Sequence, residues 1–363
     1  MEADALISVV IPSWNCADDL RRCLRSLEAQ DDVDIEVFVV DNGSTDGTVG
    51  MLRELKVPHE ALPENIGFAA AVNRGVATTS SPYVLVLNED TVVEPASLSR
   101  LLRALLGESD LGGVQPLILE MDGEPGKRDD PDAIVYSHGQ SLTRDGRARE
   151  DGAGRPQAQA PIARREIFGV CGAACLLRRE MLEGLGGYDE RYFAFYEDVD
   201  LNVRARIAGW RFRLEPTAVV WHVGHAAWTT GFARPASENA RLVARNRAAT
   251  QLKFMPLRSL PRIAAVEVAS LLQAVRERRL RATVSGKLEA ARWLGAMRQA
   301  RAELRRVGRL EAARSWLGVG WAQGRAGQAL PRPMAALRRA GGPVRAEPQE
   351  PAPPIPDSPR SSG

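Results

Sequence analysis

The stretch ISVVIPSWN at residues 7–15 joins a short apolar run to a proline and a polar loop. The run Ile7–Ile11 is too short for a helix and is rich in β-branched residues, so it predicts a buried strand. Two more runs of this kind, Ile35–Val40 and Tyr83–Leu87, also end in polar residues. We therefore predict three buried strands in this part of the chain.

Helical patterns lie between and after these strands. They begin at Asp18, which we expect to cap the first helix, after the polar turn 41–48, at Asn65–Phe68 and near Pro95. This alternation implies a mostly parallel sheet with helices on both faces. The predicted fold class is therefore α/β.

In such a sheet, ligands bind at the carboxyl ends of the strands. Polar residues follow each predicted strand, at Ser13–Asn15, Asp41–Thr48 and Asn88–Asp90. The chain has neither a Walker A loop nor a dinucleotide-binding glycine motif here, so a nucleotide would be held by other means. Asp41 is placed to accept a hydrogen bond from a base or a ribose hydroxyl; the alternative is an Asx turn with the Asn-Gly that follows it.

Residues just after the third strand are suited to bind a metal ion. Asp90 can bind Mg²⁺ or Mn²⁺ directly, and Asn88 can contribute through its amide oxygen or a water. Such an ion would neutralise charge on a departing nucleoside diphosphate. The alternative is an ordinary polar turn. His222 follows a predicted strand at Ala218–Trp221 and can complete the site, whereas His225 is the weaker choice.

The segment FYEDVDL at residues 195–201 gathers three carboxylates in four positions. If Asp198 begins a helix, the helix dipole and the free N–H groups favour its ionised form, in which it can act as a base. The alternative is an ordinary acidic cap on a surface helix.

Residues 120–166 have a different composition, rich in Gly, Pro, Asp and Arg. Ala133–Tyr136 and Gln140–Leu142 predict a short hairpin, and Arg149–Pro161 predicts a loop. Beyond this segment, the pattern predicts short strands at Arg211–Leu214 and Ala218–Trp221.

Charge is divided unevenly along the 363 residues, although the net charge is only +2. Residues 1–225 contain 23 Lys/Arg and 37 Asp/Glu, whereas residues 226–363 contain 25 and 9. The basic part suggests an anionic membrane surface; without a nucleic-acid-binding motif we expect no nucleic-acid partner. The four cysteines are too few for a disulfide framework, and we interpret them as small buried residues.

The sequence pattern predicts helices from about residue 238 to residue 325. An apolar stripe opposes basic residues between Lys287 and Arg309; its members are Trp293, Met297, Ala300, Leu304 and Val307. This helix either docks on an anionic membrane or packs on the rest of the protein. The chain shows no signal peptide and no apolar run of roughly 18 residues, so we expect a cytoplasmic protein.

Seven motifs occur in a fixed order along residues 6–250: ISVVIPSWN, VDNGSTDGT, ENIGFAAAVNRG, LNEDTVV, GVCGAACLLRRE, GGYDERYFAFYEDVDLNVRARIAGW and VVWHVGH. Together they resemble the family 2 inverting glycosyltransferases, in particular the bacterial rhamnosyltransferase- and galactofuranosyltransferase-like branch. The resemblance implies a GT-A fold and a nucleoside-diphosphate sugar donor.

The resemblance also implies roles for individual residues. Asp198 would be the catalytic base, and Glu197 and Asp200 would orient the acceptor or brace the loop. Asp90 would be the principal metal ligand and His222 the second. The residues implied on the donor side are Pro12, Trp14, Asn15, Asp41, Asn65, Gly67, Asn73, Asn88 and Glu89. Asn88, which is also counted as a metal ligand, stands where the family motif has an aspartate, and its neutral amide is a weaker ligand.

We expect a catalytic domain at 1–235, a helical, basic, membrane-docking extension at 236–340 and a disordered tail at 341–363. Within the first, 1–118 would bind the nucleotide sugar, 119–166 would be a variable acceptor-side insertion, and 167–235 would hold the acceptor and the base. The expected reaction transfers a sugar from dTDP-rhamnose or a UDP-sugar to a hydroxyl of a lipid-linked or polysaccharide acceptor, with Mg²⁺ or Mn²⁺, at the inner face of the cytoplasmic membrane.

Two alternatives stay open. A sugar-nucleotide nucleotidyltransferase would need a glycine-rich basic loop after the first strand, and Ser13–Asn15 does not provide one. A non-catalytic nucleotide-sugar-binding or scaffold subunit is favoured by Asn88 but disfavoured by Asp90, Asp198 and His222.

Overall fold

The computed structural model describes residues 6–30, 33–223 and 236–306, all of which belong to one compact unit. His225 and the predicted disordered tail 341–363 lie outside the described residues. Within the described ranges, every helix is too short or too polar to cross a lipid bilayer.

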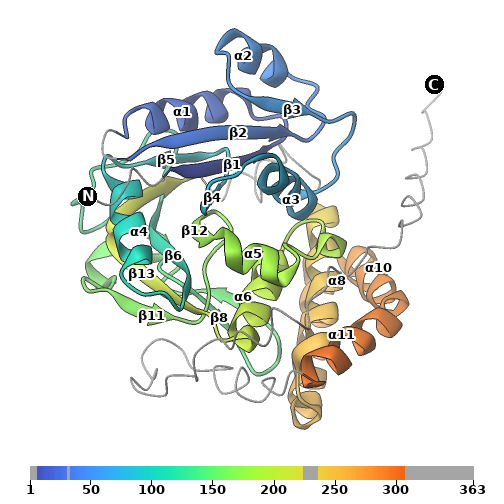
Figure 1. Cartoon of the computed structure of the whole chain (residues 1–363). Coiled ribbons are helices and arrows are strands. Elements are labelled where there is room, and N and C mark those ends of the chain that lie inside the picture. The colour runs from blue at the N-terminus through green and yellow to red at the C-terminus, as the bar shows by residue number, and fades with distance from the viewer. Residues whose placement is uncertain (1–5, 31–32, 224–235, 307–363) are drawn as a thin grey trace, which may run out of the picture. The chain divides into compact units, whose positions relative to one another are not determined.

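The predicted strands lie side by side in one sheet (Figure 1). β1 (Ile7–Ser13) pairs in parallel with β2 (Ile35–Asp41) on one side and with β4 (Tyr83–Leu87) on the other. A short strand, β3 (His59–Ala61), extends the parallel group beyond β2. The three strands predicted from the sequence are confirmed, and their carboxyl ends meet at one edge.

Helices cover both faces of this sheet, as predicted (Figure 1). On one face lie α1 (Ala17–Glu28), α2 (Thr48–Glu54) and α4 (Ser97–Leu106), and on the other α3 (Phe68–Thr78), α5 (Arg179–Leu185) and α6 (Glu197–Ala208). Because strand side chains alternate, Val9 packs with the first group and Val10 with the second. Asp18 lies in the first turn of α1 rather than at its cap, which is Cys16, so that detail of the prediction is wrong.

The second half of the sheet is mixed. β12 (Ala174–Arg178) joins β4 antiparallel, β6 (Leu111–Glu120) joins β12, and β13 (Arg211–His222) runs parallel to β6. Two short strands, β5 (Thr91–Val93) and β11 (Arg165–Ile167), pair with β13. β13 is one long strand where we predicted two, because the chain passes its central proline through a β-bulge without leaving the sheet.

The segment 120–166 is more ordered than predicted. Its strands are β7 (Ile134–Ser137), β8 (Gln140–Leu142), β9 (Ala148–Glu150) and β10 (Arg155–Pro156). β7 pairs with β6 and β10, whereas β8 pairs with β9, so the predicted hairpin of β7 with β8 is wrong. Gly139, with a φ of 138°, redirects the chain between them. The end of β9 and all of β10 lie inside the predicted loop 149–161.

In the part of the chain that the structure describes, four α-helices follow the sheet: α8 (Ala236–Phe254), α9 (Leu260–Arg276), α10 (Leu280–Arg292) and α11 (Leu294–Arg306). Trp293 separates α10 from α11, so the single amphipathic helix predicted from Lys287 onward is wrong. Met297 is fully buried against Tyr192 and Ala249. The apolar stripe of α11 therefore packs inside the protein, which was one of the two alternatives.

Candidate active site

Asn88, Asp90 and His222 come together where β4 and β13 end. Asp90 Oδ1 lies 3.0 Å from His222 Nε2, and the Asn88 side-chain amide lies 3.2 Å from the same nitrogen. Asn88 Oδ1 is buried and has no hydrogen-bond partner among the described residues. Since the amide oxygen and nitrogen can exchange places, this oxygen can also face His222. One carboxylate, one imidazole and one unsatisfied amide oxygen form a donor set that fits Mg²⁺ or Mn²⁺.

A second group of polar residues lies at the ends of β1 and β2. Asp41 accepts a hydrogen bond from the Ser44 N–H at 3.1 Å through Oδ2, which is the turn contact weighed above. Its other oxygen, Oδ1, and the Ser13 hydroxyl are buried without a partner among the described side chains. The Asn15 N–H donates to Ser44 Oγ at 2.8 Å, so the two loops are joined. Asp41 therefore makes the turn and keeps one acceptor for a ligand hydroxyl.

Glu89 connects these two groups. Burial and the charge of Asp90 raise its pKa to about 8, and the backbone N–H of Trp14 opposes the rise. Pro12 is buried within β1. The group of Asn88, Asp90 and His222 therefore adjoins the loop after β1.

The residues predicted around α3 divide into two sets. Asn65 accepts from the Gly67 N–H at 2.9 Å, and a side chain on Gly67 (φ 93°) would collide with Phe193. Gly67 thus permits close contact with the segment before Asp198. Asn73 instead binds the backbone N–H and C=O of Tyr188, at 2.8 and 2.9 Å. Its Nδ2 also donates to Glu190 Oε1 at 2.9 Å, so the amide holds the loop at residues 188–190.

Asp198 lies in the first turn of α6 and accepts three hydrogen bonds. The donors are the N–H groups of Gly172 and Val199, at 3.0 and 2.7 Å, and Gln140 Nε2 at 2.9 Å. Burial nevertheless raises its pKa above the usual value, and the donors only partly offset this. The Val199 N–H at the start of α6 favours the ionised form, as expected, but desolvation has the larger effect. A raised pKa suits a base that must take up a proton.

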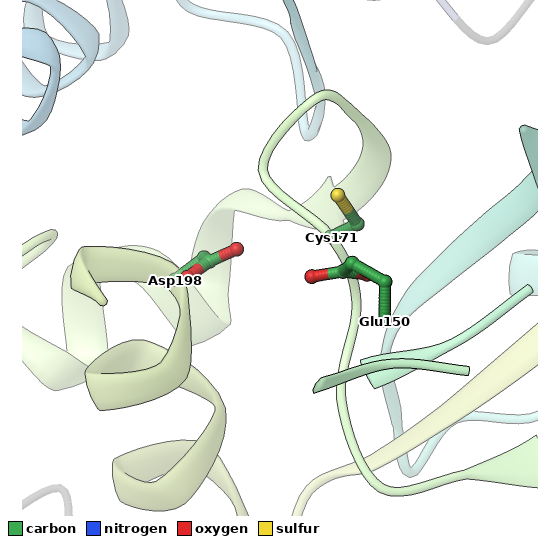
Figure 2. Close-up of side chains that lie close together, drawn as sticks. All are labelled: Glu150, Cys171 and Asp198. Atoms are coloured by element: carbon green, nitrogen blue, oxygen red, sulfur yellow. The ribbon is translucent and has the colours of Figure 1, made fainter. Parts of the chain in front are cut away.

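Glu150 lies beside Asp198 and was not predicted from the sequence. Figure 2 shows the Glu150 and Asp198 carboxylates converging with the Cys171 thiol, and their ligand atoms all lie within 4.8 Å of one another. Gln140 Nε2 donates to both carboxylates, at 3.0 Å to Glu150. Burial, followed by the charge of Asp198, raises the pKa of Glu150 to about 7. No sequence signal marked Glu150, because it falls in the segment that read as a loop.

The other two acids of the 195–201 segment point in different directions. Glu197 is buried, and its Oε2 has no partner among the described residues. Burial and the neighbouring Asp198 raise its pKa well above the usual value. Asp200 is fully buried and pairs with Arg204 and with Lys253 of α8, both at 2.5 Å. These contacts support bracing rather than acceptor contact for Asp200.

A short loop joins the group of Asn88, Asp90 and His222 to the pair of carboxylates, Glu150 and Asp198. The Asn88 N–H donates to Ala173 O at 2.9 Å, and the neighbouring Gly172 N–H donates to Asp198. Tyr136 packs its ring edge-on against His222, with centroids 4.5 Å apart. Burial, then Cys171 and the carboxylates of Glu150, Asp90 and Asp198, raise the pKa of Tyr136. Both groups therefore border one site.

α8 holds the backbone just before Asp198. Three residues have positive φ values, between 66° and 71°: Phe193, Phe195 and Tyr196. Residues other than glycine adopt such values only at a cost in conformational free energy. Asn246 is fully buried, and its Nδ2 donates to the carbonyls of Tyr192, Ala194 and Phe195, at 2.7–2.8 Å. Asparagine is disfavoured in the interior of a helix, so its occurrence in the middle of α8 is the sequence signal that could have identified Asn246.

We expect Asn246→Ala to lower kcat by about tenfold with little change in donor KM, because the strained loop would lose its hold and Asp198 would shift. Unfolding free energy should also fall by about 1–3 kcal/mol. Gln251→Ala is the matched control, since Gln251 is also on α8 but binds Asp145 and Glu267 instead. A loss of stability with unchanged kcat well below the melting temperature would contradict a positioning role.

We expect Glu150→Gln to flatten the dependence of stability on pH. The pKa of Glu150 is raised from 4.5 to about 7, so between these values the unfolded chain releases a proton that the folded chain keeps. Stability therefore falls as pH rises through this window, by about 1–3 kcal/mol for this group. Melting temperatures from pH 4.5 to 8 should decline less for Glu150→Gln than for the wild type or for the exposed-site variant Glu64→Gln. Equal slopes would contradict the raised pKa.

Comparisons of this chain with known proteins, by sequence and by structure, all identify glycosyltransferases as similar. A family model described as Glycosyl transferase family 2 matches residues 8–186. An N-acetylglucosaminyl-diphospho-decaprenol L-rhamnosyltransferase of Mycobacterium tuberculosis is 32% identical over 250 residues, which are 62% of this chain and 78% of that protein. A pre-mycofactocin glycosyltransferase of the same species is 32% identical over 223 residues, covering 60% of this chain and 42% of that protein. The crystal structure of GalNAc-T7 with UDP, GalNAc and Mn²⁺ has a similar fold, with a TM-score of 0.54, 14% identity and coverage of 70% of this chain and 49% of that chain.

Proposed function

The chain belongs to glycosyl transferase family 2, and from that premise we propose that it is an inverting enzyme that uses Asp198 as its general base. It has the GT-A fold and is a glycosyltransferase that takes its sugar from a nucleotide sugar.

One observation carries the proposal. The segment Gly172–Ala173 contacts both Asp198 and Asn88 through its backbone. This adjacency would place a sugar whose diphosphate lies at Asp90 within reach of a base on α6. An inverting transfer needs that arrangement, with the leaving group and the base on different sides of the reacting carbon.

In the proposed mechanism, Asp198 takes the proton from an acceptor hydroxyl while the oxygen of that hydroxyl attacks the anomeric carbon of the donor sugar. Gln140 and Gly172 hold the carboxylate in place while its charge is lost. A divalent cation held by Asp90, His222 and Asn88 would neutralise the charge of the departing nucleoside diphosphate. Asp41 and the loop after β1 would bind the nucleoside.

We further propose dTDP-rhamnose or a UDP-sugar as donor and a lipid-linked or polysaccharide acceptor. The name of the mycobacterial relative supports rhamnose and a lipid-linked diphosphate. Residues 1–235 would form the catalytic domain, with the insertion 119–166 on the acceptor side, where Glu150 reaches the base. The basic region 236–325, of which residues 307–325 lie outside the described part, would hold the enzyme at the inner face of the cytoplasmic membrane.

The test is a panel of dTDP-, UDP- and GDP-sugars with and without Mn²⁺ or Mg²⁺, read by thermal shift and by nucleotide release. We expect one nucleotide class to stabilise the protein only when metal is present. Stabilisation by a donor without turnover on any acceptor would favour a non-catalytic binding subunit. No response to any donor would contradict the proposal.

A further inference from the structure

The outward face of α9 is apolar and carries no charge along most of its length. Leu260, Val268, Leu272 and Val275 recur at helical spacing and are 55%, 58%, 63% and 55% exposed. Together with Ala264 they define what we call the α9 face. Single exposed apolar residues are ordinary, but a continuous row on one helix marks a surface that meets a partner.

The inner side of α9 explains why this face points outward. Glu267 is the only charged residue between 263 and 275, and it pairs with Arg247 of α8 and with Lys287 of α10. Ser270 also accepts a hydrogen bond from Arg247, at 2.8 Å. These polar contacts fix the rotation of the helix. The α9 face therefore stays exposed as long as these side-chain contacts hold α9 to α8 and α10.

Arginines stand at both ends of the α9 face. Arg258 precedes it, and Arg276, Arg278 and Arg281 follow it; all four are exposed. None of the four pairs with a carboxylate among the residues that the structure describes. Residues 257–306 contain 12 Lys/Arg and 4 Asp/Glu in all. The partner of this surface must therefore be both apolar and negatively charged.

We propose that the α9 face docks on an anionic lipid bilayer, with its leucines and valines among the acyl chains and the flanking arginines on lipid phosphates. The inference rests on the membrane location proposed above and assigns the surface responsible. It differs from the stripe that the sequence suggested, since Met297 is buried. A second copy fits less well, because an antiparallel pairing of two α9 faces would bring Arg258 against Arg276 and Arg278.

The test measures binding of the full chain to vesicles by sedimentation. Vesicles of phosphatidylcholine with phosphatidylglycerol are compared with phosphatidylcholine alone. We expect binding to the anionic vesicles, weakened by salt. The double variant Val268→Glu/Leu272→Glu should bind at least about tenfold more weakly. Ile162→Glu is the matched control, because Ile162 is 95% exposed and lies in a loop rather than in α9.

Nucleotide release with a water-soluble acceptor is measured in parallel, so that failure of docking and failure of the proposed activity can be told apart. Equal binding by the double variant and the wild type would overturn the proposal. So would a concentration-dependent dimer that the double variant abolishes, since the face would then meet a second copy. A lower melting temperature of the double variant, with no vesicle binding by the wild type, would overturn it in favour of coverage by residues 307–363.

Discussion

Asp198→Asn is expected to lower kcat by about 10²- to 10⁴-fold while leaving donor binding intact. The amide has the shape of the carboxylate but cannot accept the proton of the acceptor hydroxyl. Its Nδ2 would also face one of the N–H donors that now bind the carboxylate, which we expect to cost about 1–2 kcal/mol of unfolding free energy. Steady-state transfer and metal-dependent thermal shift with the nucleoside diphosphate measure the two effects separately.

Glu197→Gln is the matched comparison, because Glu197 is the neighbouring buried acid in the same turn of α6. We expect it to lower kcat by less than tenfold, about the effect of a small shift near the site. If Glu197→Gln lost far more activity than Asp198→Asn, the unpartnered Glu197 oxygen would be the base and our assignment would be wrong. If neither variant changed kcat, proton transfer would lie elsewhere.

Local patterns were enough to predict the first half of the fold. Ile7–Ile11 and Tyr83–Leu87 are short β-branched runs with polar ends, and such runs have few alternatives to a buried strand. β6 was missed because its two glycines and a proline break the pattern that a strand shows. In the structure Gly112 lets Met181 of α5 and Trp210 pack closely against the strand, since a side chain on Gly112 would meet both.

Residues of the candidate site could be predicted where they lie in one short sequence motif, but not where they come together from distant segments of the chain. Asp90 and Asp198 each lie in a recognisable run, whereas Glu150 reaches Asp198 only through the pairing of β8 with β9. Asn246 lies 52 residues from Ala194, whose carbonyl it binds. No local periodicity predicts contacts over such separations, because they depend on how α8 packs against the sheet domain.

Asp90→Asn is expected to abolish the metal-dependent stabilisation of the protein by nucleoside diphosphate and to lower kcat by about 10²- to 10³-fold. Asp90 is the one carboxylate in the group with Asn88 and His222, so its loss leaves only neutral ligands. The opposite variant, Asn88→Asp, adds a second carboxylate and should tighten Mn²⁺ binding. Calorimetric titration with Mn²⁺, at fixed pH and ionic strength, measures both the expected loss of affinity in Asp90→Asn and the expected gain in Asn88→Asp.

Glu60→Gln serves as the control, because Glu60 is a carboxylate on β3 that pairs with Arg74 and takes no part in the site. It should leave Mn²⁺ affinity unchanged. If Asp90→Asn bound Mn²⁺ as the wild type does, the ion would be held elsewhere, and the group of Glu150, Cys171 and Asp198 would be the next to test. Glu150 and Asp198 are less suited to bind a metal ion than Asp90 is. Burial raises the pKa values of both carboxyls and favours their neutral forms. Opposite shifts in Mn²⁺ affinity for the Asp90 and Asn88 variants would therefore locate the ion at the ends of β4 and β13.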